Sequence, residues 1–337
     1  MSLPNEPSPL LAFETINAFR KTAAIKAAIE LKIFSHIASG ATTPSAIAAR
    51  AHASERGVRI LCDGLTTLGF LHKSDDAYRL TPDSAAFLDE KSPTYIGGTL
   101  EFLLSPALTS NFEDLAAAVR KGGTAQTALG TLAPEHPVWI QFARAMAPMM
   151  ISPAHALAEL LSRDQRPATR VLDIAAGHGM WGIAFAQKNP TTHLVALDWE
   201  PVLTVTRENA ERAGLGGRCS TISGNAFAVD LGSDYDLVLV PNFLHHFNMV
   251  ECVVFLKKVR AALRDGGSVA IAELVPNPDR VTPPEAALFS LVMLASTPQG
   301  DAYTFAEFEQ ILAEAGFKTP EKHPLPPSSL TAIIAQK

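Results

Sequence analysis

The stretch from residue 169 to residue 199 constrains the fold of this 337-residue chain more than any other. Residues 171–174 (VLDI) are a short apolar run that contains one acid, a pattern typical of a buried strand. A turn of small residues (AAGHG) follows, and small residues let a ligand approach the backbone closely. Residues 181–187 then predict a helix, and residues 193–197 predict a second strand that ends on Asp198. This order of elements predicts one half of a doubly wound nucleotide-binding sheet.

Two cofactors fit this pattern, and a tight turn without any ligand is the third interpretation. The glycines from Gly177 to Gly182, with Asp198 about 20 residues later, match the dinucleotide fingerprint that predicts an NAD(P)-dependent oxidoreductase. Asp173 argues against NAD(P), because its carboxylate would lie where a pyrophosphate must pass. An acid there suits S-adenosylmethionine, which has an amino group and a sulfonium but no phosphate. Asp198 is placed to hold the ribose hydroxyls of either cofactor.

Composition and charge argue against several other classes of protein. The chain is long enough for two domains, and its 47% hydrophobic and 18% charged residues are typical of a globular protein. No run approaches the roughly 18 apolar residues of a membrane span, and MSLPNEPSPLL lacks the features of a signal peptide. We therefore expect a cytoplasmic protein without a membrane partner. Three cysteines without metal-ligand spacing predict free thiols and no metal site, and a net charge of -6 argues against nucleic acid.

The first hundred residues predict a helical domain. Residues 8–39 read as helical, and apolar side chains such as Leu11, Ile16 and Phe19 recur on a broad face that a partner subunit would bury. Two capped helices and a hairpin follow within residues 43–80, and this order predicts a winged-helix module.

A winged helix raises the hypothesis of a DNA-binding regulator. The second of the two capped helices has Arg56 and Arg59, but Glu55 and Asp63 offset their charge. A DNA reader needs more cations along that helix, so a scaffold or dimerisation role is favoured.

Helices are also predicted from residue 93 to residue 162. Trp139, Phe142, Met146, Met149 and Met150 recur there at helical spacing, which is more often the pattern of a core than of a pocket. Their position directly before the nucleotide site makes a pocket role an equal alternative for Phe142 and Met146.

The second half of the chain continues to alternate between strands and helices. Further strands are predicted at 219–223, 236–240 and 268–272, with helices at 202–213, 250–263 and 305–316. Two late strands, 318–324 and 329–336, predict a hairpin and thus an antiparallel addition to the sheet. A parallel sheet with such an end is typical of class I methyltransferases and not of dinucleotide dehydrogenases.

Two motifs now carry a family resemblance. The sequence from Asp173 to Gly179 (DIAAGHG) resembles the first class I methyltransferase motif, D/E-x-G-x-G-x-G, with Ala175 at the first glycine. LHHFNMVECVVFLKKVRAALRDGGSVAIAELVP resembles, without a gap, the L-H-D-W-x-x-x-x-C pattern of the dimeric small-molecule O-methyltransferases, and SLVMLASTPQGDAYTFAEFEQ resembles a later family stretch. This family includes caffeate, hydroxyindole, polyketide and phenazine O-methyltransferases, and the resemblance covers nearly the whole chain.

The resemblance implies a Rossmann-like class I methyltransferase α/β sheet with a C-terminal antiparallel hairpin, preceded by a winged-helix dimerisation domain. It places the dimerisation domain at 1–100 and the S-adenosylmethionine domain at 101–337, with a substrate-pocket segment at 101–162 and the core at 163–337. It implies a homodimer that methylates a hydroxylated aromatic or polyketide-like small molecule. Its implied cofactor-binding residues are Asp173, Ala175, Gly177, Gly179, Asp198, Trp199, Asn225, Ala226 and Phe227. The expected pocket residues are Trp139, Phe142, Met146, Met149, His246, Phe289 and Met293.

By the same match, His245 falls on the family's catalytic base and Glu273 on the acid that orients it. A hydroxyl acceptor must lose its proton, and an imidazole with an ordinary pKa of about 6.5 suits that task. His245 is predicted just beyond the fourth strand of the sheet, and Glu273 just beyond the fifth. Taken singly, each has a simpler interpretation, as a polar helix N-terminus and a strand-end acid.

The chain also departs from the family pattern. His246 stands where the family has an aspartate, and Asn225 and Ala226 replace residues of the G-D-M-F adenine turn. The family's second acid falls on Ala302, with Asp301 one place earlier. These departures leave open carbon or nitrogen methylation, or a reaction without methyl transfer on the same fold.

Overall fold

We describe a computed structural model covering residues 7–126, 130–132, 138–163 and 168–337. The chain divides into two compact units, Met1–Ser105 and Pro106–Lys337, and each is described by itself. Within the described part of the chain, no helix has the length and apolar character needed to cross a membrane.

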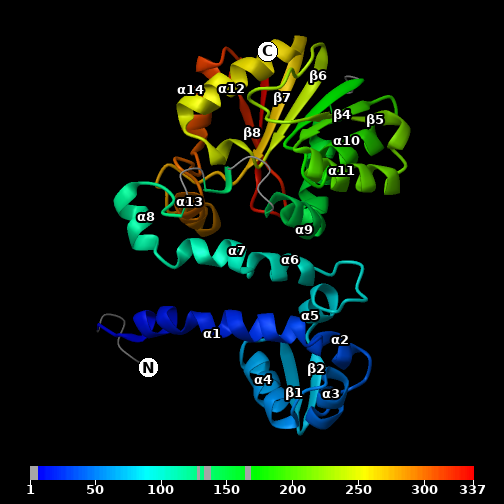
Figure 1. Ribbon diagram of the computed structural model, residues 1–337, viewed down its shortest axis with the longest axis vertical. Coiled ribbons are helices and arrows are strands. Elements are labelled where there is room, and N and C mark those ends of the chain that lie inside the picture. The colour runs from blue at the N-terminus through cyan, green and yellow to red at the C-terminus, as the bar shows by residue number, and fades with distance from the viewer. Residues whose placement is uncertain (1–6, 127–129, 133–137, 164–167) are drawn as a thin grey trace. The chain divides into compact units, whose positions relative to one another are not determined.

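The first unit is a small helical domain with a two-stranded hairpin (Figure 1). Its elements are α1 (Leu10–Glu30), α2 (Ile33–Ala38), α3 (Pro44–Ala51), α4 (Glu55–Thr67), β1 (Leu71–Ser74), β2 (Ala77–Leu80), α5 (Pro82–Phe87) and α6 (Gly97–Leu103). The predicted caps are present, since the side chains of Thr43 and Ser54 accept the backbone N–H groups of Ala46 and Gly57. Each such cap stabilises its helix by about 1 kcal/mol.

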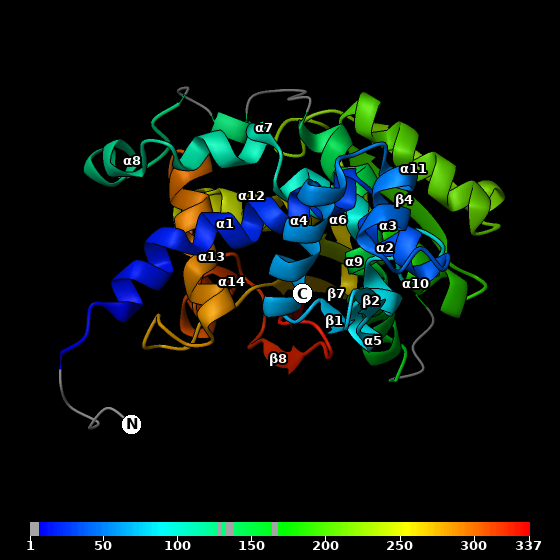
Figure 2. The same ribbon diagram turned by 90° about the horizontal axis from the view of Figure 1, so that it is seen from below.

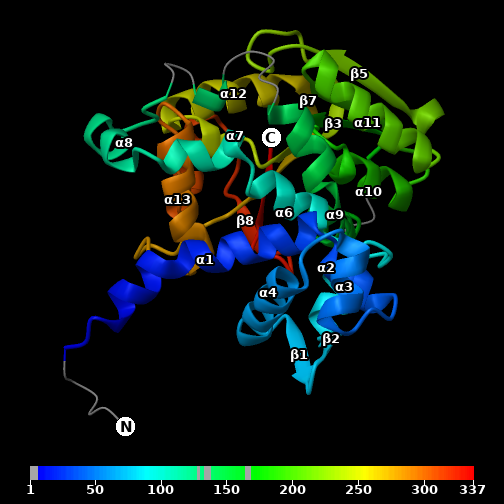
Figure 3. The same cartoon turned by 60° about the horizontal axis from the view of Figure 1, so that its bottom comes forward.

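The N-terminal helix differs from its prediction in one way, and its exposed apolar face leaves room for the expected partner subunit. The expected continuous helix over residues 8–39 breaks after Glu30, because Lys32 takes a left-handed backbone conformation with a φ of 52°. The apolar side chains of Leu11, Ile16 and Phe19 are 76%, 68% and 65% exposed, so the chain does not bury this face itself. In Figures 2 and 3 the first half of α1 extends away from α2, α3 and α4.

The second unit is built on a seven-stranded sheet among the described residues, in the order β5-β4-β3-β6-β7-β9-β8. Its strands are β3 (Arg170–Ile174), β4 (His193–Asp198), β5 (Cys219–Ser223), β6 (Tyr235–Pro241), β7 (Leu263–Glu273), β8 (Glu321–Pro324) and β9 (Thr331–Gln336). Its helices are α7 (Pro106–Thr109), α8 (Leu115–Lys121), α9 (Val138–Leu161), α10 (Met180–Lys188), α11 (Glu200–Arg212), α12 (Met249–Ala262), α13 (Pro284–Ser296) and α14 (Phe305–Glu314). Short 3-10 turns are η1 (Ser110–Phe112), η2 (Gly130–Leu132), η3 (Gly216–Arg218) and η4 (Leu244–His246).

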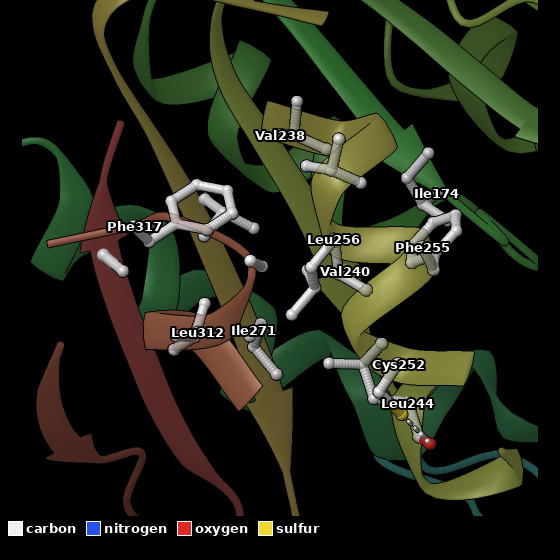
Figure 4. Close-up of a cluster of buried hydrophobic side chains, with 14 of the residues drawn as sticks. Ile174, Val238, Val240, Leu244, Cys252, Phe255, Leu256, Ile271, Leu312 and Phe317 are labelled. Atoms are coloured by element: carbon white, nitrogen blue, oxygen red, sulfur yellow. Dashed lines mark hydrogen bonds between the residues drawn. The ribbon is translucent and has the colours of Figure 1, made fainter. Parts of the chain in front are cut away.

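Alternate residues of the central strands feed two separate cores. Leu172 and Ile174 of β3 pack with α12 and α14, while Val171 packs on the opposite face with α9 and α10. Figure 4 shows Phe255 and Leu256 of α12 against Ile174 and the side chains of β6. Burying one such side chain contributes about 1.5–3 kcal/mol, so helices on both faces fix the sheet.

The C-terminal hairpin is confirmed. β9 pairs antiparallel with β7, from Ser268 opposite Gln336 to Glu273 opposite Thr331, and β8 forms the outer edge. β3, β4, β6 and β7 are mutually parallel, so their carboxyl ends meet at one edge of the sheet.

Candidate active site

The turn after β3 is built on three residues with left-handed backbone. Ala175, Gly177 and Gly179 have φ values of 49°, 57° and 76°. The replacement of the family's first glycine by Ala175 is therefore not only a change of size, because a side chain in this conformation costs about 1–2 kcal/mol.

The two glycines serve different purposes. A side chain added at Gly177 would meet only the carbonyl oxygen of Ala175, at 3.7 Å, so space adjoins the backbone there. A side chain added at Gly179 would lie 2.8 Å from Cγ2 of Thr206 on α11. Gly177 thus leaves space beside the backbone, and Gly179 is required by the packing of α11.

Asp173 lies beneath this turn. It is fully buried within β3, and its Oδ2 accepts the backbone N–H of Gly182 at 3.0 Å. Its Oδ1 is buried without a partner among the described residues. Burial raises the pKa of Asp173 to about 8, so the group holds a proton at neutral pH.

Asp198 is the last residue of β4. Its Oδ2 accepts the backbone N–H of Gly177 at 2.8 Å, and its Oδ1 accepts that of Trp199 at 2.7 Å. Each carboxylate oxygen has a second lone pair, so the group can still accept hydrogen bonds from the hydroxyl groups of a ribose. Burial raises the pKa of Asp198 to about 6, which leaves it mostly ionised at neutral pH.

The loop between β5 and β6 contains the expected adenine turn. Asn225 is exposed, and its Oδ1 accepts the backbone N–H of Phe227 at 2.9 Å. Ala226 is buried, and the ring of Phe227 contacts Phe247 and Phe255 at 4.8 and 5.1 Å between centroids.

His245 and Glu273 come together at the ends of β6 and β7. Nδ1 of His245 lies 2.5 Å from Oε2 of Glu273, and both side chains are buried. Oε1 of Glu273 accepts the backbone N–H groups of Phe243 and Leu244, each at 3.0 Å. A carboxylate opposite Nδ1 keeps the ring proton on that nitrogen and leaves the lone pair on Nε2. Nε2 has no hydrogen-bond partner in the described ranges.

His246 packs beside the first histidine. Its ring lies 4.3 Å from that of His245 and 5.3 Å from that of Trp139, between centroids. Its Nδ1 is buried without a partner among the described residues. Burial, and to a smaller extent the neighbouring His245, hold the pKa of His246 well below its ordinary value, so this imidazole is neutral.

The expected pocket residues divide into two groups. Phe289 of α13 contacts the ring of His245 at 4.8 Å, and Phe142 contacts Trp139 at 5.8 Å, so these side chains gather around the two histidines. Met293 is buried and Met146 is partly buried. Met149 is 43% exposed. Its neighbour Met150 instead meets Asn242, just beyond β6, at 3.8 Å between Sδ and Nδ2.

The segment from 297 to 303 supports the histidines from behind, and sequence reasoning missed it. A side chain added at Gly300 would lie 2.3 Å from the carbonyl oxygen of His245, so only glycine fits. The hydroxyl of Tyr303 donates to the carbonyl of Phe247 at 2.5 Å. Gly300 lies within the family-like stretch, but its spacing alone does not signal this contact.

Asp301 already has an arginine and a backbone amide as partners. Its Oδ2 pairs with Arg280 at 3.3 Å, and its Oδ1 accepts the backbone N–H of Ala302 at 2.8 Å. Arg280 also pairs with Glu307. Ala302 is buried and brings no charge to this position.

Together, these residues fit S-adenosylmethionine. The open space beside Gly177 and the spare lone pairs of Asp198 suit an adenosyl group, and the free Nε2 of His245 suits a proton acceptor. No group of three or more potential metal ligands occurs in the part of the chain that the structure describes.

Two protein families match this chain. The O-methyltransferase domain family matches residues 112–318, and the O-methyltransferase dimerisation domain family matches residues 13–90. The 3-hydroxy-5-methyl-1-naphthoate 3-O-methyltransferase of Streptomyces sahachiroi is 30% identical over 324 residues, covering 93% of this chain and 90% of that protein.

Solved structures show the same fold. A crystal structure from Nostoc punctiforme PCC 73102, named as a candidate O-methyltransferase, has a TM-score of 0.96 and 52% identity, covering 98% of this chain and all of the other. Human N-acetylserotonin methyltransferase, solved with S-adenosylmethionine, has a TM-score of 0.85 and 22% identity, covering 100% and 99% of the two chains. The chain therefore belongs to the S-adenosylmethionine-dependent O-methyltransferases that carry an N-terminal dimerisation domain.

Proposed function

We propose that this enzyme methylates a hydroxyl group of an aromatic or polyketide-like small molecule, with His245 as the general base. The observation that carries the proposal is the contact between His245 and Glu273, which leaves Nε2 of the imidazole free. The naphthoate substrate named for the Streptomyces relative supports an aromatic acceptor.

When bound, S-adenosylmethionine supplies a methyl group activated by the positive sulfur. Asp198 would accept hydrogen bonds from the ribose hydroxyls, and Asn225, Ala226 and Phe227 would border the adenine. The backbone at Ala175, Gly177 and Gly179 would hold the remainder of the cofactor, together with Asp173 and Trp199.

Nε2 of His245 is the group that would remove the proton of the acceptor hydroxyl. Once Nε2 has accepted that proton, Glu273, at Nδ1, would stabilise the resulting imidazolium. Phe289 and Trp139 line an apolar surface against which an aromatic ring can pack.

His246 narrows the class of acceptor. An unpaired N–H is rarely buried, so the buried Nδ1 is the unprotonated nitrogen and Nε2 carries the hydrogen. His246 thus offers a neutral donor where an aspartate would offer an acceptor. A phenol with an acyl group on the neighbouring ring carbon has a carbonyl oxygen that could accept a hydrogen bond from that donor.

The proposal extends to assembly and location. Residues 1–100 form the dimerisation domain of a homodimer, in which a partner covers the exposed side chains of α1, and residues 101–337 form the catalytic domain. The enzyme acts in the cytoplasm. Sedimentation of the full chain as a monomer at micromolar concentration would contradict the homodimer.

A mass-spectrometric screen tests the reaction. The protein is incubated with methyl-labelled S-adenosylmethionine and a panel of hydroxylated aromatics, and label is expected on the oxygen of at least one phenol. Label on carbon or nitrogen only would contradict transfer to oxygen. Thermal stabilisation by NAD but not by S-adenosylhomocysteine would contradict the choice of cofactor.

A further inference from the structure

Lys258 makes a set of hydrogen bonds that its sequence context does not signal. It lies in the third turn of α12, and its Nζ donates to the carbonyl oxygens of Ala226 at 3.0 Å, Phe227 at 2.9 Å and Val229 at 2.5 Å. An ammonium has three N–H donors, so these three carbonyls satisfy it completely. One side chain therefore holds the loop between β5 and β6 at three points.

The same loop has little other backbone support. The N–H groups of Ala228 and Val229 both turn back to the carbonyl of Asn225, at 2.8 and 2.9 Å. Among the described residues, the carbonyls that Lys258 binds have no other hydrogen-bond donor. The path of this loop thus depends on Lys258, on the turn at Asn225 and on the packing of the Phe227 ring against α12.

The helix that carries Lys258, α12, also begins close to His245, the proposed general base. Asn248 caps α12 through a capping box with Glu251, two residues after His246. At 1.5 Å per residue, Lys258 lies about 15 Å along the helix from this cap. One rigid element therefore connects the segment of the base to the loop that borders the adenine.

We propose that Lys258 is a positioning residue for the cofactor, and that its ammonium fixes the 225–229 loop in the shape that receives the adenine. The inference rests on the proposed function, because it takes Asn225, Ala226 and Phe227 as the adenine turn. It assigns to α12 a second role, which is to keep that turn at a fixed distance from His245.

The surroundings of Lys258 support a structural use of its charge. The side chain is partly buried, and burial lowers the pKa of its ammonium while the charge of Asp230 raises it. Its neighbour Lys257 is exposed and has no hydrogen bond or ion pair within the described ranges, so it provides a matched control. Methionine is a suitable replacement for either lysine, because it keeps an unbranched stem and removes the ammonium.

Calorimetric titration with S-adenosylhomocysteine tests the proposal on the full chain. Lys258→Met is expected to raise the Kd about tenfold or more, which corresponds to about 1.4 kcal/mol at 25 °C. Lys257→Met is expected to leave the Kd close to that of wild type. Lys258→Arg keeps the charge, but its planar fork cannot converge on three carbonyls, so an intermediate Kd is expected.

Hydrogen exchange gives a readout that needs no cofactor. Amides of residues 225–229 should exchange faster in Lys258→Met, while those of α12 keep their protection. Unchanged affinity together with unchanged exchange would overturn the proposal, and so would equal weakening by Lys257→Met. If wild type does not bind S-adenosylhomocysteine, the proposed function fails, and the exchange measurement still decides whether Lys258 holds the loop. If Lys258→Met does not fold, the Lys258→Arg titration decides, and a wild-type Kd for that variant contradicts the proposal.

Discussion

Asp198 and Glu273 occupy equivalent places in the sheet but have different partners. Each is the last residue of a parallel strand, and each accepts backbone N–H groups. Asp198 accepts those of Gly177 and of the next residue, Trp199, and Glu273 accepts those of Phe243, Leu244 and His245. Glu273 differs because its second oxygen also meets the imidazole of His245. Backbone donors hold a carboxylate in place, whereas an imidazole partner adds a group that can take up a proton. From this comparison we predict that the end of β4 binds the cofactor and that the ends of β6 and β7 together provide proton transfer.

Removal of the imidazole should have the largest effect. His245→Ala is expected to lower kcat/KM by about 10²–10⁴, which is the usual contribution of a general base. The Kd for S-adenosylhomocysteine, measured by calorimetry, should stay close to wild type because Asp198 is intact. Full turnover by this variant would reject the base assignment.

Removal of the Asp198 carboxylate should mainly weaken cofactor binding, whereas removal of the imidazole should mainly slow turnover. Asp198→Ala is expected to weaken S-adenosylhomocysteine about 10- to 100-fold, because charged hydrogen bonds to the ribose are lost. Asp198→Asn retains one acceptor oxygen and should give a smaller loss. Both Kd values come from the same titration. If Asp198→Ala bound S-adenosylhomocysteine normally but turned over slowly, the proposed difference between the ends of β4 and β7 would be contradicted.

The buried acid beneath the turn predicts a pH dependence of stability. The pKa of Asp173 is about 8 in the folded protein and about 3.9 in the unfolded chain. The folded state therefore holds more protons, and stability should decrease as pH rises from about 6.5 to about 8. Below about 6.5, His178 acts in the opposite direction, because burial lowers its pKa to about 4.

Asp173→Asn should flatten this decrease. Wild type is expected to lose at most about 1.4 kcal/mol of unfolding free energy per pH unit through Asp173. Urea unfolding of both proteins without cofactor, at several pH values in this window, gives the two slopes. Equal slopes would show that Asp173 does not retain its proton.

The second histidine should affect selectivity more than rate. His246→Phe keeps an aromatic ring against Trp139 but removes the N–H donor. Its kcat/KM for 2-hydroxyacetophenone relative to phenol should fall about tenfold, because a hydrogen bond to the carbonyl is lost. A ratio equal to that of wild type would remove His246 from acceptor recognition.

The smallest effect concerns the strained turn. Ala175→Gly relieves a left-handed alanine but increases the freedom of the unfolded chain, so a net stabilisation below about 1 kcal/mol is expected. Ala176→Gly is the control. Ala176 is buried without a positive φ, and its replacement should destabilise the protein. Urea unfolding measures both, and a clear loss of stability in Ala175→Gly would contradict the strain.

Local patterns predicted most of the fold. β5 has the predicted limits, from Cys219 to Ser223, because short strands between turn residues are well signalled. The caps at Thr43 and Ser54 are local side-chain chemistry and were also predictable. The break at Lys32 has no glycine or proline to signal it, so periodicity alone missed it.

Long-range contacts explain what sequence reasoning missed at the site. Gly300 packs against the carbonyl of His245, and Lys258 donates a hydrogen bond to the carbonyl of Ala226. Both contacts join segments that are distant in sequence. The same is true of the pairing of Asp301 with Arg280, which a one-residue shift from the family pattern does not suggest. His245 and Glu273 were predicted as a pair only because the family resemblance covers both residues.

The central claim is that Asp198 and His245 act on one cofactor, the first as its ribose anchor and the second as the base at its reactive end. A crystal structure of the full chain with S-adenosylhomocysteine tests this most directly. The account predicts ribose hydroxyls on the carboxylate of Asp198 and the thioether facing Nε2 of His245. A thioether directed away from His245, or a ribose that does not contact Asp198, would contradict it.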